Sequence, residues 1–231
     1  MRMDGTALDN PFWNSLDSLH AGVAVRAGSA AARYPEDVAP FLGIATPGAA
    51  TPEALSALMA PGEAWLVLGV MPDPLPAGWQ LEPFPELLQM VREELLPDED
   101  DAGIVPLGAD RRDDVLALTA LVYPHYFRPG TTELGRYFGI DEDARLVAMI
   151  GERLGMPGWR EMSAICTHPD ATGRGLARKL TTMLTNDTLR RGDTPFLHVS
   201  PSNTRAAELY LRMGYRLRRT LPFAVLRRAA P

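Results

Sequence analysis

The clearest pattern of apolar and polar positions lies in the second half of the chain, where short apolar runs alternate with amphipathic segments. Residues 112–122 repeat Val115, Leu118 and Leu121 at helical spacing, which predicts a helix. Strands that alternate with helices and end in an antiparallel edge are typical of an α/β sandwich. The other expected helices are 176–191 and 204–213, and the expected strands are 104–107, 137–140, 145–151, 161–167, 196–200 and 223–228.

The first hundred residues carry a weaker pattern with many prolines. Residues 34–41 and 64–70 predict strands, and residues 52–59 and 85–96 predict helices. The acidic run at 97–101 reads as a linker, because like charges repel and apolar residues are lacking there. We therefore expect a smaller α/β domain over residues 1–101 and a second domain over residues 102–231.

Charge is distributed unevenly along the 231 residues, whose net charge is −6. Residues 1–101 contain 4 basic and 16 acidic side chains, whereas residues 102–231 contain 19 basic and 13 acidic ones. The second region is therefore the one that attracts an anionic ligand. Its basic residues are dispersed and not interleaved with aromatic ones, so we expect a phosphate-bearing small molecule and no nucleic acid.

Apolar runs and cysteine content indicate the cellular compartment. The longest apolar run, over residues 64–71, is far shorter than the roughly 20 residues that span a bilayer. The first residues have no apolar segment of secretory type, and the single cysteine permits no internal disulfide. We expect a cytoplasmic protein that does not associate with membranes.

A glycine-rich turn, Thr172-Gly-Arg-Gly-Leu-Ala177, joins the apolar strand around Ile165 to the helix that follows. Such a turn directs backbone N–H groups and the positive end of a helix dipole into one concavity, which suits phosphate. It lacks the Gly-Lys-Ser/Thr of a P-loop and the third glycine of a dinucleotide-binding turn. The turn alone therefore leaves open phosphate binding and a plain strand-to-helix connection.

A second group of residues lies about 30 positions further on, between Asn203 and Tyr215. Asn203 is a natural helix N-cap, and Gly214 is a natural residue to end the helix. Asn203 and Tyr210 are seven positions apart, which puts them on one helix face roughly 10 Å apart along the axis. They are either a capping Asn and a core Tyr, or two groups that face a common ligand.

Together, residues 166–177 and 203–215 closely resemble the GNAT superfamily of acyl-CoA N-acyltransferases, in particular its branch of FR-forty-seven-like proteins. The resemblance extends over residues 102–231. It implies an α+β fold with a mixed, mostly antiparallel twisted sheet, flanked by helices, whose two central strands part to admit acetyl-CoA. It also implies direct acetyl transfer, in a ternary complex, to a primary amine of a small molecule or peptide, by a monomer or homodimer without a metal.

The resemblance implies a role for each matching residue. An exposed N–H near Thr167 would polarise the thioester carbonyl. Tyr210 would protonate the departing thiolate, since the ordinary pKa values of a phenol and a thiol lie close together. Thr172 stands where the family has Gln or Arg, and its backbone N–H is the group expected to bind. The expected cofactor-binding residues are Cys166, Thr167 and His168 for the pantetheine arm, Thr172, Gly173, Arg174, Gly175, Leu176 and Ala177 for the pyrophosphate, and Asn203 for the arm again.

The general base is the least determined part of the site. An ammonium substrate must lose a proton before it attacks, which requires a carboxylate or a water relay. Glu161 occupies the strand position of the base in some family members, but a solvated strand-end glutamate is an equal reading. Glu152 is the reserve candidate. We expect His198 to face the core more than the cleft, and Cys166 to be a small strand residue and not a nucleophile.

Two further expectations concern the acceptor and the role of the first hundred residues. Residues 123–137 suggest an aromatic-walled pocket in which Arg128 and Arg136 bind a carboxylate of the acceptor. Residues 1–101 would cover one side of the acceptor cleft if they are a degenerate GNAT-like half. The alternatives to N-acyl transfer are a non-catalytic acyl-CoA-binding regulatory module and an O-acyltransferase.

Overall fold

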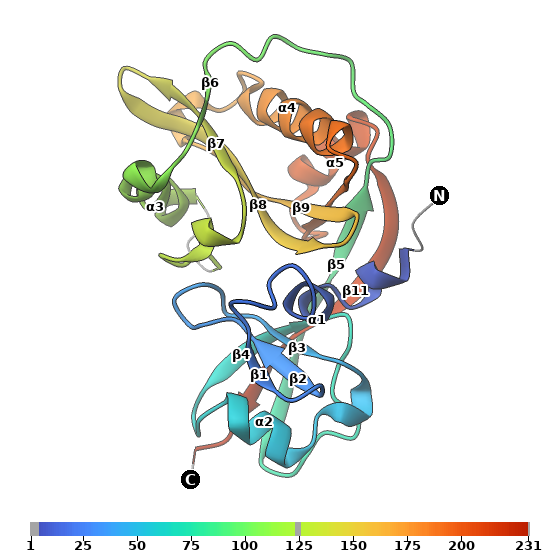
Figure 1. Ribbon diagram of the computed structural model, residues 1–231. Coiled ribbons are helices and arrows are strands. Elements are labelled where there is room, and N and C mark those ends of the chain that lie inside the picture. The colour runs from blue at the N-terminus through green and yellow to red at the C-terminus, as the bar shows by residue number, and fades with distance from the viewer. Residues whose placement is uncertain (1–4, 123–125, 231) are drawn as a thin grey trace.

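One long twisted sheet organises the chain in the computed structural model, which describes residues 5–122 and 126–230. Within these ranges eight strands lie in the order β4-β11-β5-β10-β9-β8-β7-β6, and every neighbouring pair is antiparallel except β9–β10 (Figure 1). The strands are β4 (Ala64–Leu68), β5 (Trp79–Val91), β6 (Ile104–Pro106), β7 (Tyr137–Glu142), β8 (Arg145–Met156), β9 (Trp159–Thr167), β10 (Thr194–Val199) and β11 (Arg216–Arg228).

Helices cover both faces of the sheet in the half that contains β6–β10. Helix α3 (Arg112–Val122) buries Val115 against one face, where it meets Met149 of β8. Helices α4 (Leu176–Arg190) and α5 (Thr204–Arg212) lie on the other face, where Leu180 packs with Ile150. Met149 and Ile150 are consecutive, and successive side chains of a strand point to opposite faces of the sheet. One residue therefore packs against α3 and the next against α4. The α+β sandwich expected from the sequence is confirmed.

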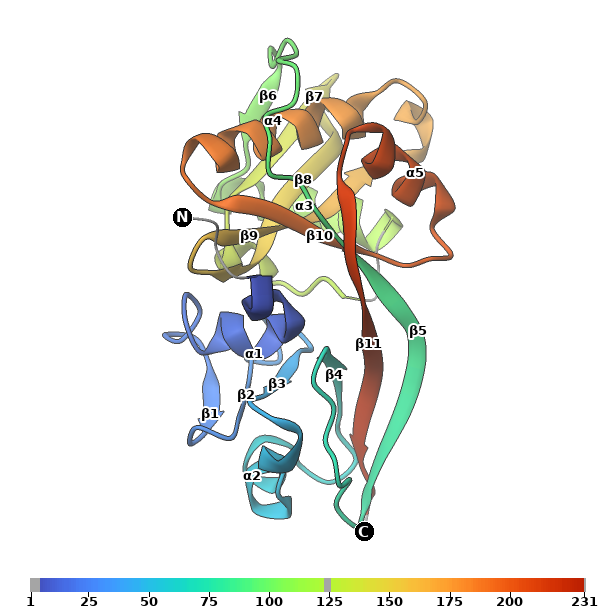
Figure 2. The ribbon, with the colours of Figure 1, turned by 90° about the vertical axis from the view of Figure 1, so that its right-hand side faces the viewer.

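The first hundred residues are joined to the rest through two long strands (Figure 2). Strands β5 and β11 pair along most of their length and run through both halves of the molecule. Beside them lies a small three-stranded sheet, β1-β2-β3, with two short helices. These elements are α1 (Pro11–Leu16), β1 (Val25–Ala27), β2 (Ala31–Arg33), β3 (Leu42–Ile44) and α2 (Pro52–Leu58).

Strands β4 and β5 come from before residue 101 and yet belong to the same sheet as the strands that follow it. The division into domains 1–101 and 102–231 stays a prediction, but the hydrogen-bonded sheet crosses it. No helix in the described ranges has the length and apolar character that a membrane span requires.

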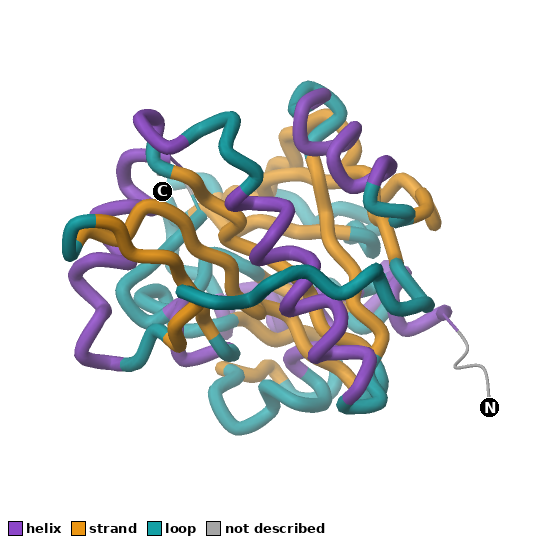
Figure 3. Tube along the Cα trace, turned by 90° about the horizontal axis from the view of Figure 1, so that it is seen from above, coloured by secondary structure: helices purple, strands orange, loops and turns teal. Residues whose placement is uncertain are grey.

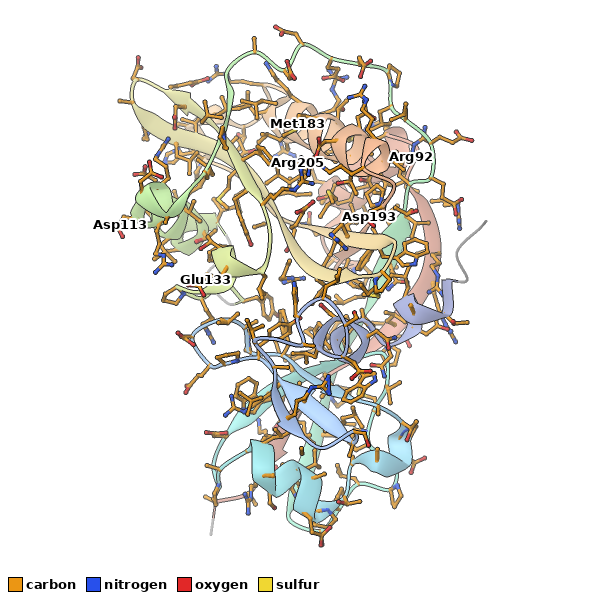
Figure 4. The ribbon with its side chains drawn as sticks, in the orientation of Figure 1. Arg92, Asp113, Glu133, Met183, Asp193 and Arg205 are labelled. Carbon is orange, nitrogen blue, oxygen red and sulfur yellow. The ribbon has the colours of Figure 1, made fainter. Side chains whose placement is uncertain are left out.

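The acidic segment at 97–101 is held against α4 (Figure 3). Leu96 exchanges two hydrogen bonds with the Asn186 side chain, at 2.8 Å and 3.1 Å. Arg190 lies 2.6 Å from the Asp98 carboxylate, so basic residues of the helix offset the repulsion within the acidic run. Arg92, the residue after β5, is labelled in Figure 4. It donates to Gly214 O at 3.1 Å, beside the end of α5.

Two of the expected elements are wrong, and both lie in the first hundred residues. Residues 85–96 were expected to be helical, but residues up to Val91 belong to β5, because β10 and β11 supply backbone partners on both of its edges. Residues 34–41 form the turn between β2 and β3 and not a strand, since Pro35 and the acidic pair after it favour a turn. The remaining expected elements are present, and the final strand begins earlier, at Arg216.

The contact between β3 and α1 leaves no room for a side chain at Gly43. A Cβ there would lie 2.4 Å from Trp13 N and 2.5 Å from Trp13 Cα, which are backbone atoms that cannot give way alone. We therefore expect Gly43→Ala to lower the free energy of unfolding by about 1–3 kcal/mol in urea titrations. Gly48→Ala is the matched control, because a Cβ at Gly48 meets no atom within 4 Å. Equal stability of the two variants would contradict this packing.

Candidate functional site

Strands β9 and β10 pair over only a short stretch and then diverge. Their parallel pairing ends at Phe196↔Glu161, and beyond it β10 remains paired with β5 alone. On β9, Ala164 has a φ of 50°, and the register against β8 shifts there, so one extra residue bulges from the ladder. The expected V between two central strands is present, and a backbone irregularity lies on its wall.

A cavity of about 430 Å³ opens between the diverging strands. Residues of β9, β10 and α5 form one part of its wall, and residues of the first hundred positions form another. The β9, β10 and α5 part, with the loop between β10 and α5, consists of Met162, Ser163, Ala164, Ile165, Cys166, Leu197, His198, Val199, Ser200, Ser202, Asn203, Ala206 and Tyr210. Cys166 from the strand motif and Asn203 and Tyr210 from the helix motif thus meet at one cavity, whereas residues 167–177 are not among the described residues of its wall.

The glycine-rich turn has the geometry that phosphate binding requires. Gly173 and Gly175 have φ values of 79° and 80°, a conformation that residues with a Cβ rarely adopt. A Cβ at either position would meet no atom within 4 Å, so the turn borders open space. The first N–H groups of any helix have no intrahelical acceptor. Helix α4 begins at Leu176, and no side chain caps these groups. The backbone here fits a pyrophosphate group.

Both donors of Thr172 are directed at one backbone oxygen within the turn, and its expected role in phosphate binding stays a prediction. Its N–H is directed at Pro169 O at 3.4 Å, and its hydroxyl donates to the same oxygen at 3.0 Å. The two arginines near the turn have acidic partners: Arg174 forms a bidentate pair with Glu142, and Arg178 lies 2.6 Å from Glu99. The open positive charge of the turn therefore comes from backbone dipoles.

Asn203 and Tyr210 line the same cavity from one face of α5, as their spacing predicts. Asn203 Oδ1 accepts from Ala206 N at 3.2 Å, so the residue caps the helix and also reaches the cavity wall. Tyr210 is 7% exposed, and its ring lies 6.0 Å from that of Tyr215. Asn203 is therefore both a helix N-cap and a residue of the cavity wall.

The backbone of β9 near its end is divided between β8 and the opening. His168 donates its N–H to Val147 O at 2.8 Å, so the C=O of Thr167, on the same peptide unit, points away from β8. That direction is the open edge, where β10 has left. The His168 ring accepts from Asp170 N at 3.2 Å and supports the turn. The roles predicted for Cys166, Thr167 and His168 toward the pantetheine arm stay predictions.

The Glu161 carboxylate is buried at the point where β9 and β10 part. Arg153 of β8 donates to its two oxygens at 2.9 Å and 2.8 Å, and His198 Nδ1 lies 2.7 Å from Oε1. Burial raises the pKa of this carboxyl, but the Arg153 charge and the hydrogen bonds outweigh burial and lower the pKa to about 2. Glu161 is ionised at neutral pH, and it is not among the described residues that line the cavity.

Gln89 on β5 determines which nitrogen of His198 carries the proton. Gln89 Nε2 donates to Leu8 O at 2.8 Å, and Gln89 Oε1 accepts from Arg218 at 2.8 Å. The same Nε2 lies 3.0 Å from His198 Nε2. An amide NH₂ can only donate, so His198 Nε2 accepts and Nδ1 holds the proton that faces Glu161. His198 is expected in the core and is indeed buried, yet it also lines the cavity.

Glu152, the reserve candidate for the base, is also engaged. Arg136 binds both of its carboxylate oxygens and pairs with Asp187 as well. Neither Arg136 nor Arg128 is among the described residues of the cavity wall, so the expected carboxylate-binding role of these two arginines has no support in this geometry. Of the predicted acceptor segment, Tyr126 does line the cavity, whereas residues 123–125 lie outside the described part of the chain.

The sequence predicted that residues 1–101 cover one side of the acceptor cleft, but it did not indicate which of them line the cavity, and it gave no role to Arg153. The aromatic rings of Phe12 and Phe41 carry no local motif, and only the fold brings them to the cavity. Arg153 and Glu161 lie on consecutive strands with opposite charge, which is the signal that could have indicated the pair. Among the residues that the structure describes, no three His, Cys, Asp or Glu side chains are grouped to hold a metal ion.

Loss of the Glu161 charge leaves Arg153 without its buried counter-ion, so we expect Glu161→Gln to cost about 3–5 kcal/mol of unfolding free energy. The folded pKa of about 2 lies below the ordinary 4.5. This stabilisation is therefore complete above about pH 4.5 and is lost as the pH falls toward 2. Urea titrations across this range should show a weaker acid dependence in the variant. Glu142→Gln, in an exposed pair, should cost far less than Glu161→Gln, and equal losses in the two variants would refute the assignment.

The reactivity of the Cys166 thiol reports whether this part of the cavity wall is closed to a reagent. Burial raises the pKa of its thiol to about 12, so little thiolate exists near pH 8. We expect iodoacetamide to label the folded protein at least about 100-fold more slowly than the chain unfolded in urea, as followed by mass spectrometry. Labelling at similar rates in the two states would show a reactive thiol.

Comparison with known proteins identifies this arrangement. The family model of the FR47-like protein matches residues 137–223. A GNAT-family protein from Novosphingobium aromaticivorans has 32% identity and a TM-score of 0.85, over 96% of this chain and 99% of that one. A GCN5-related N-acetyltransferase from Kribbella flavida shares the fold at 17% identity, with a TM-score of 0.63 over 97% and 96% of the chains. Among curated proteins none matches the sequence. The likeness to the Novosphingobium protein covers nearly all of both chains, and the chain belongs to the GNAT family of acyl-CoA N-acyltransferases.

Proposed function

We propose that the protein transfers acetyl from acetyl-CoA to a primary amine by direct attack within a ternary complex. The observation that carries this proposal is the combination of three features. β9 and β10 diverge beyond Glu161↔Phe196, the Gly173–Gly175 turn that follows β9 in the chain borders open space, and Tyr210 lines the cavity between the two strands. A binding fold without chemistry needs the first two features, and the third adds an acid.

The chain offers acetyl-CoA a backbone site. The N–H groups at the start of α4 and in the turn would hold the pyrophosphate, since they combine unpaired donors with the positive end of a 15-residue helix. The open edge of β9 near Thr167 would hold the pantetheine arm as a strand holds a neighbouring strand. Bound acetyl-CoA supplies a thioester, whose carbonyl carbon is the electrophile for the amine.

Tyr210 would supply the proton that the leaving sulfur needs. The amine nitrogen adds to the carbonyl carbon, the C–S bond then breaks, and the sulfur leaves with the electron pair. Tyr210 Oη gives its proton to that sulfur, a transfer favoured by the closeness of ordinary phenol and thiol pKa values, and the proton that the nitrogen loses as the amide forms restores the Tyr210 hydroxyl. Extra backbone donors at the Ala164 bulge would stabilise charge on the carbonyl oxygen.

Direct transfer is favoured over a covalent acyl-cysteine by the surroundings of Cys166. The thiol is buried, and the cause of its raised pKa is burial alone, with no cation to stabilise a thiolate. Attack by this sulfur would need the form that its environment suppresses. An amine that enters the cavity meets no such barrier, because it attacks as a neutral nucleophile.

Tyr210→Phe tests the proposed acid. Removal of one hydroxyl should lower kcat about 100-fold or more while the KM for acetyl-CoA stays within about twofold, since the proton is needed only as the thiolate leaves. CoA release is followed with a thiol reagent over a panel of amine and alcohol acceptors.

Tyr215→Phe is the matched control, because its hydroxyl bonds Thr185 at 2.6 Å and its ring packs beside Tyr210. It should retain wild-type kcat. An unchanged kcat in Tyr210→Phe removes the acid from the mechanism. Binding of acetyl-CoA without turnover of any acceptor would instead support the non-catalytic module, and turnover of alcohols alone would support O-acyl transfer.

A further inference from the structure

The cavity continues beyond β9 and β10 into a chamber with aromatic walls. Phe12 and Phe41 stack at 4.4 Å between ring centroids, and Phe84 lies 5.2 Å from Phe223. Tyr126 meets Phe223 edge-on at 6.4 Å. All five rings line the cavity, together with Leu68, Pro85, Leu87 and Val122. This arrangement offers faces and edges to a flat apolar ligand.

Charge in the chamber is arranged in an unusual way for a site that receives an amine. Arg153 is the one Lys, Arg, Asp or Glu residue among the described residues of the wall. Its guanidinium lies 4.9 Å from the Phe41 ring centre and pairs with Glu161 behind the wall. An ammonium ion that entered here would lose its hydration and gain no carboxylate partner, which is costly.

The groups expected to deprotonate an ammonium ion are all engaged elsewhere. Glu161 is held by Arg153 and His198, and Glu152 by Arg136. His198 lines the cavity, but its Nδ1 faces Glu161 and its Nε2 accepts from Gln89. Catalysis at this site therefore needs a nitrogen that carries its lone pair when it arrives.

We infer that the acceptor is an arylamine, with its nitrogen attached to an aryl ring, and that it binds uncharged. This inference rests on the proposed acetyl transfer and names the class of its second substrate. The ring occupies the space between the Phe12–Phe41 and Phe84–Phe223 pairs, and the nitrogen points toward Tyr210 and the β9 bulge. An arylamine is neutral at physiological pH, so it needs no base before it attacks, and the proton that it loses as the amide forms goes to the Tyr210 oxygen.

The first hundred residues acquire a role from this inference. Phe12 comes from α1, Phe41 from the residue before β3, Leu68 from β4 and Phe84 from β5. They build the chamber wall that faces away from α5, and thus determine which acceptor fits. Residues 102–231 supply the cofactor turn and Tyr210.

The pH dependence of transfer distinguishes this acceptor class from charged amines. With aniline, kcat/KM should stay nearly constant from about pH 6.5 to 8.5, because the amine is neutral throughout. With 2-phenylethylamine, kcat/KM should rise about tenfold per pH unit, as the neutral fraction of an alkylamine does. Putrescine and glutamate should be acetylated at least about 100-fold less efficiently than either aromatic amine at the same pH.

Phe84→Ala tests the chamber without disturbing the core, since this ring is 42% exposed. It should raise the KM for aniline at least about fivefold and leave the KM for acetyl-CoA unchanged. Phe138→Ala on β7 is the matched control, because it removes the same ring from a site outside the described cavity wall. Ligand-observed NMR measures aniline binding directly for both variants, with and without CoA.

The two measurements separate this inference from the proposed function. Acetyl transfer that prefers putrescine or glutamate, or is indifferent to Phe84→Ala, overturns the acceptor class and leaves acetyl transfer intact. Aniline binding that is lost in Phe84→Ala but retained in Phe138→Ala supports the aromatic chamber even when no acetyl transfer occurs. Absence of aniline binding in the wild type overturns the inference whatever the cofactor result.

Discussion

The buried Glu161 carboxylate lies at the apex of the opening on which the site depends. It belongs to the last residue pair that joins β9 to β10, and it binds Arg153 of β8 and His198 of β10. Removing two charges from water is costly, so such a pair persists only when its hydrogen bonds are complete. Here they are supplied by strands on either side of β9. The network fixes the place where pairing stops and the cavity begins.

The same network extends to the first residues of the chain. Gln89 links His198 to the backbone of Leu8, and Arg218 of β11 links Gln89 to Gly5 O at 2.6 Å. The apex of the opening is thus coupled to the segment that leads into α1, which carries Phe12. The wall of the aromatic chamber and the opening between β9 and β10 are therefore held by one continuous set of hydrogen bonds.

The quality of the sequence predictions followed the range of the interactions behind them. The turn at Gly173–Gly175, the cap at Asn203 and the face shared by Asn203 and Tyr210 depend on residues close in sequence, and all are found. Residues 85–96 were misassigned because their conformation depends on β10 and β11, each more than 100 positions away. Glu161 was interpreted either as the general base or as a solvated strand-end acid, and its ion pair was not predicted because the counter-ion is visible only across the hairpin.

By itself the sequence determined the family, the α+β class, the glycine-rich turn and the helix that carries Tyr210. These features rest on backbone conformation and short spacings, which local residue types specify. Tertiary structure alone decided that β5 lies between β11 and β10 in the sheet and that Glu161 is held in a buried ion pair. It also decided that five aromatic rings from distant segments form one chamber. The reason is physical: strand pairing, burial of charge and ring packing are long-range interactions whose partners no local pattern names.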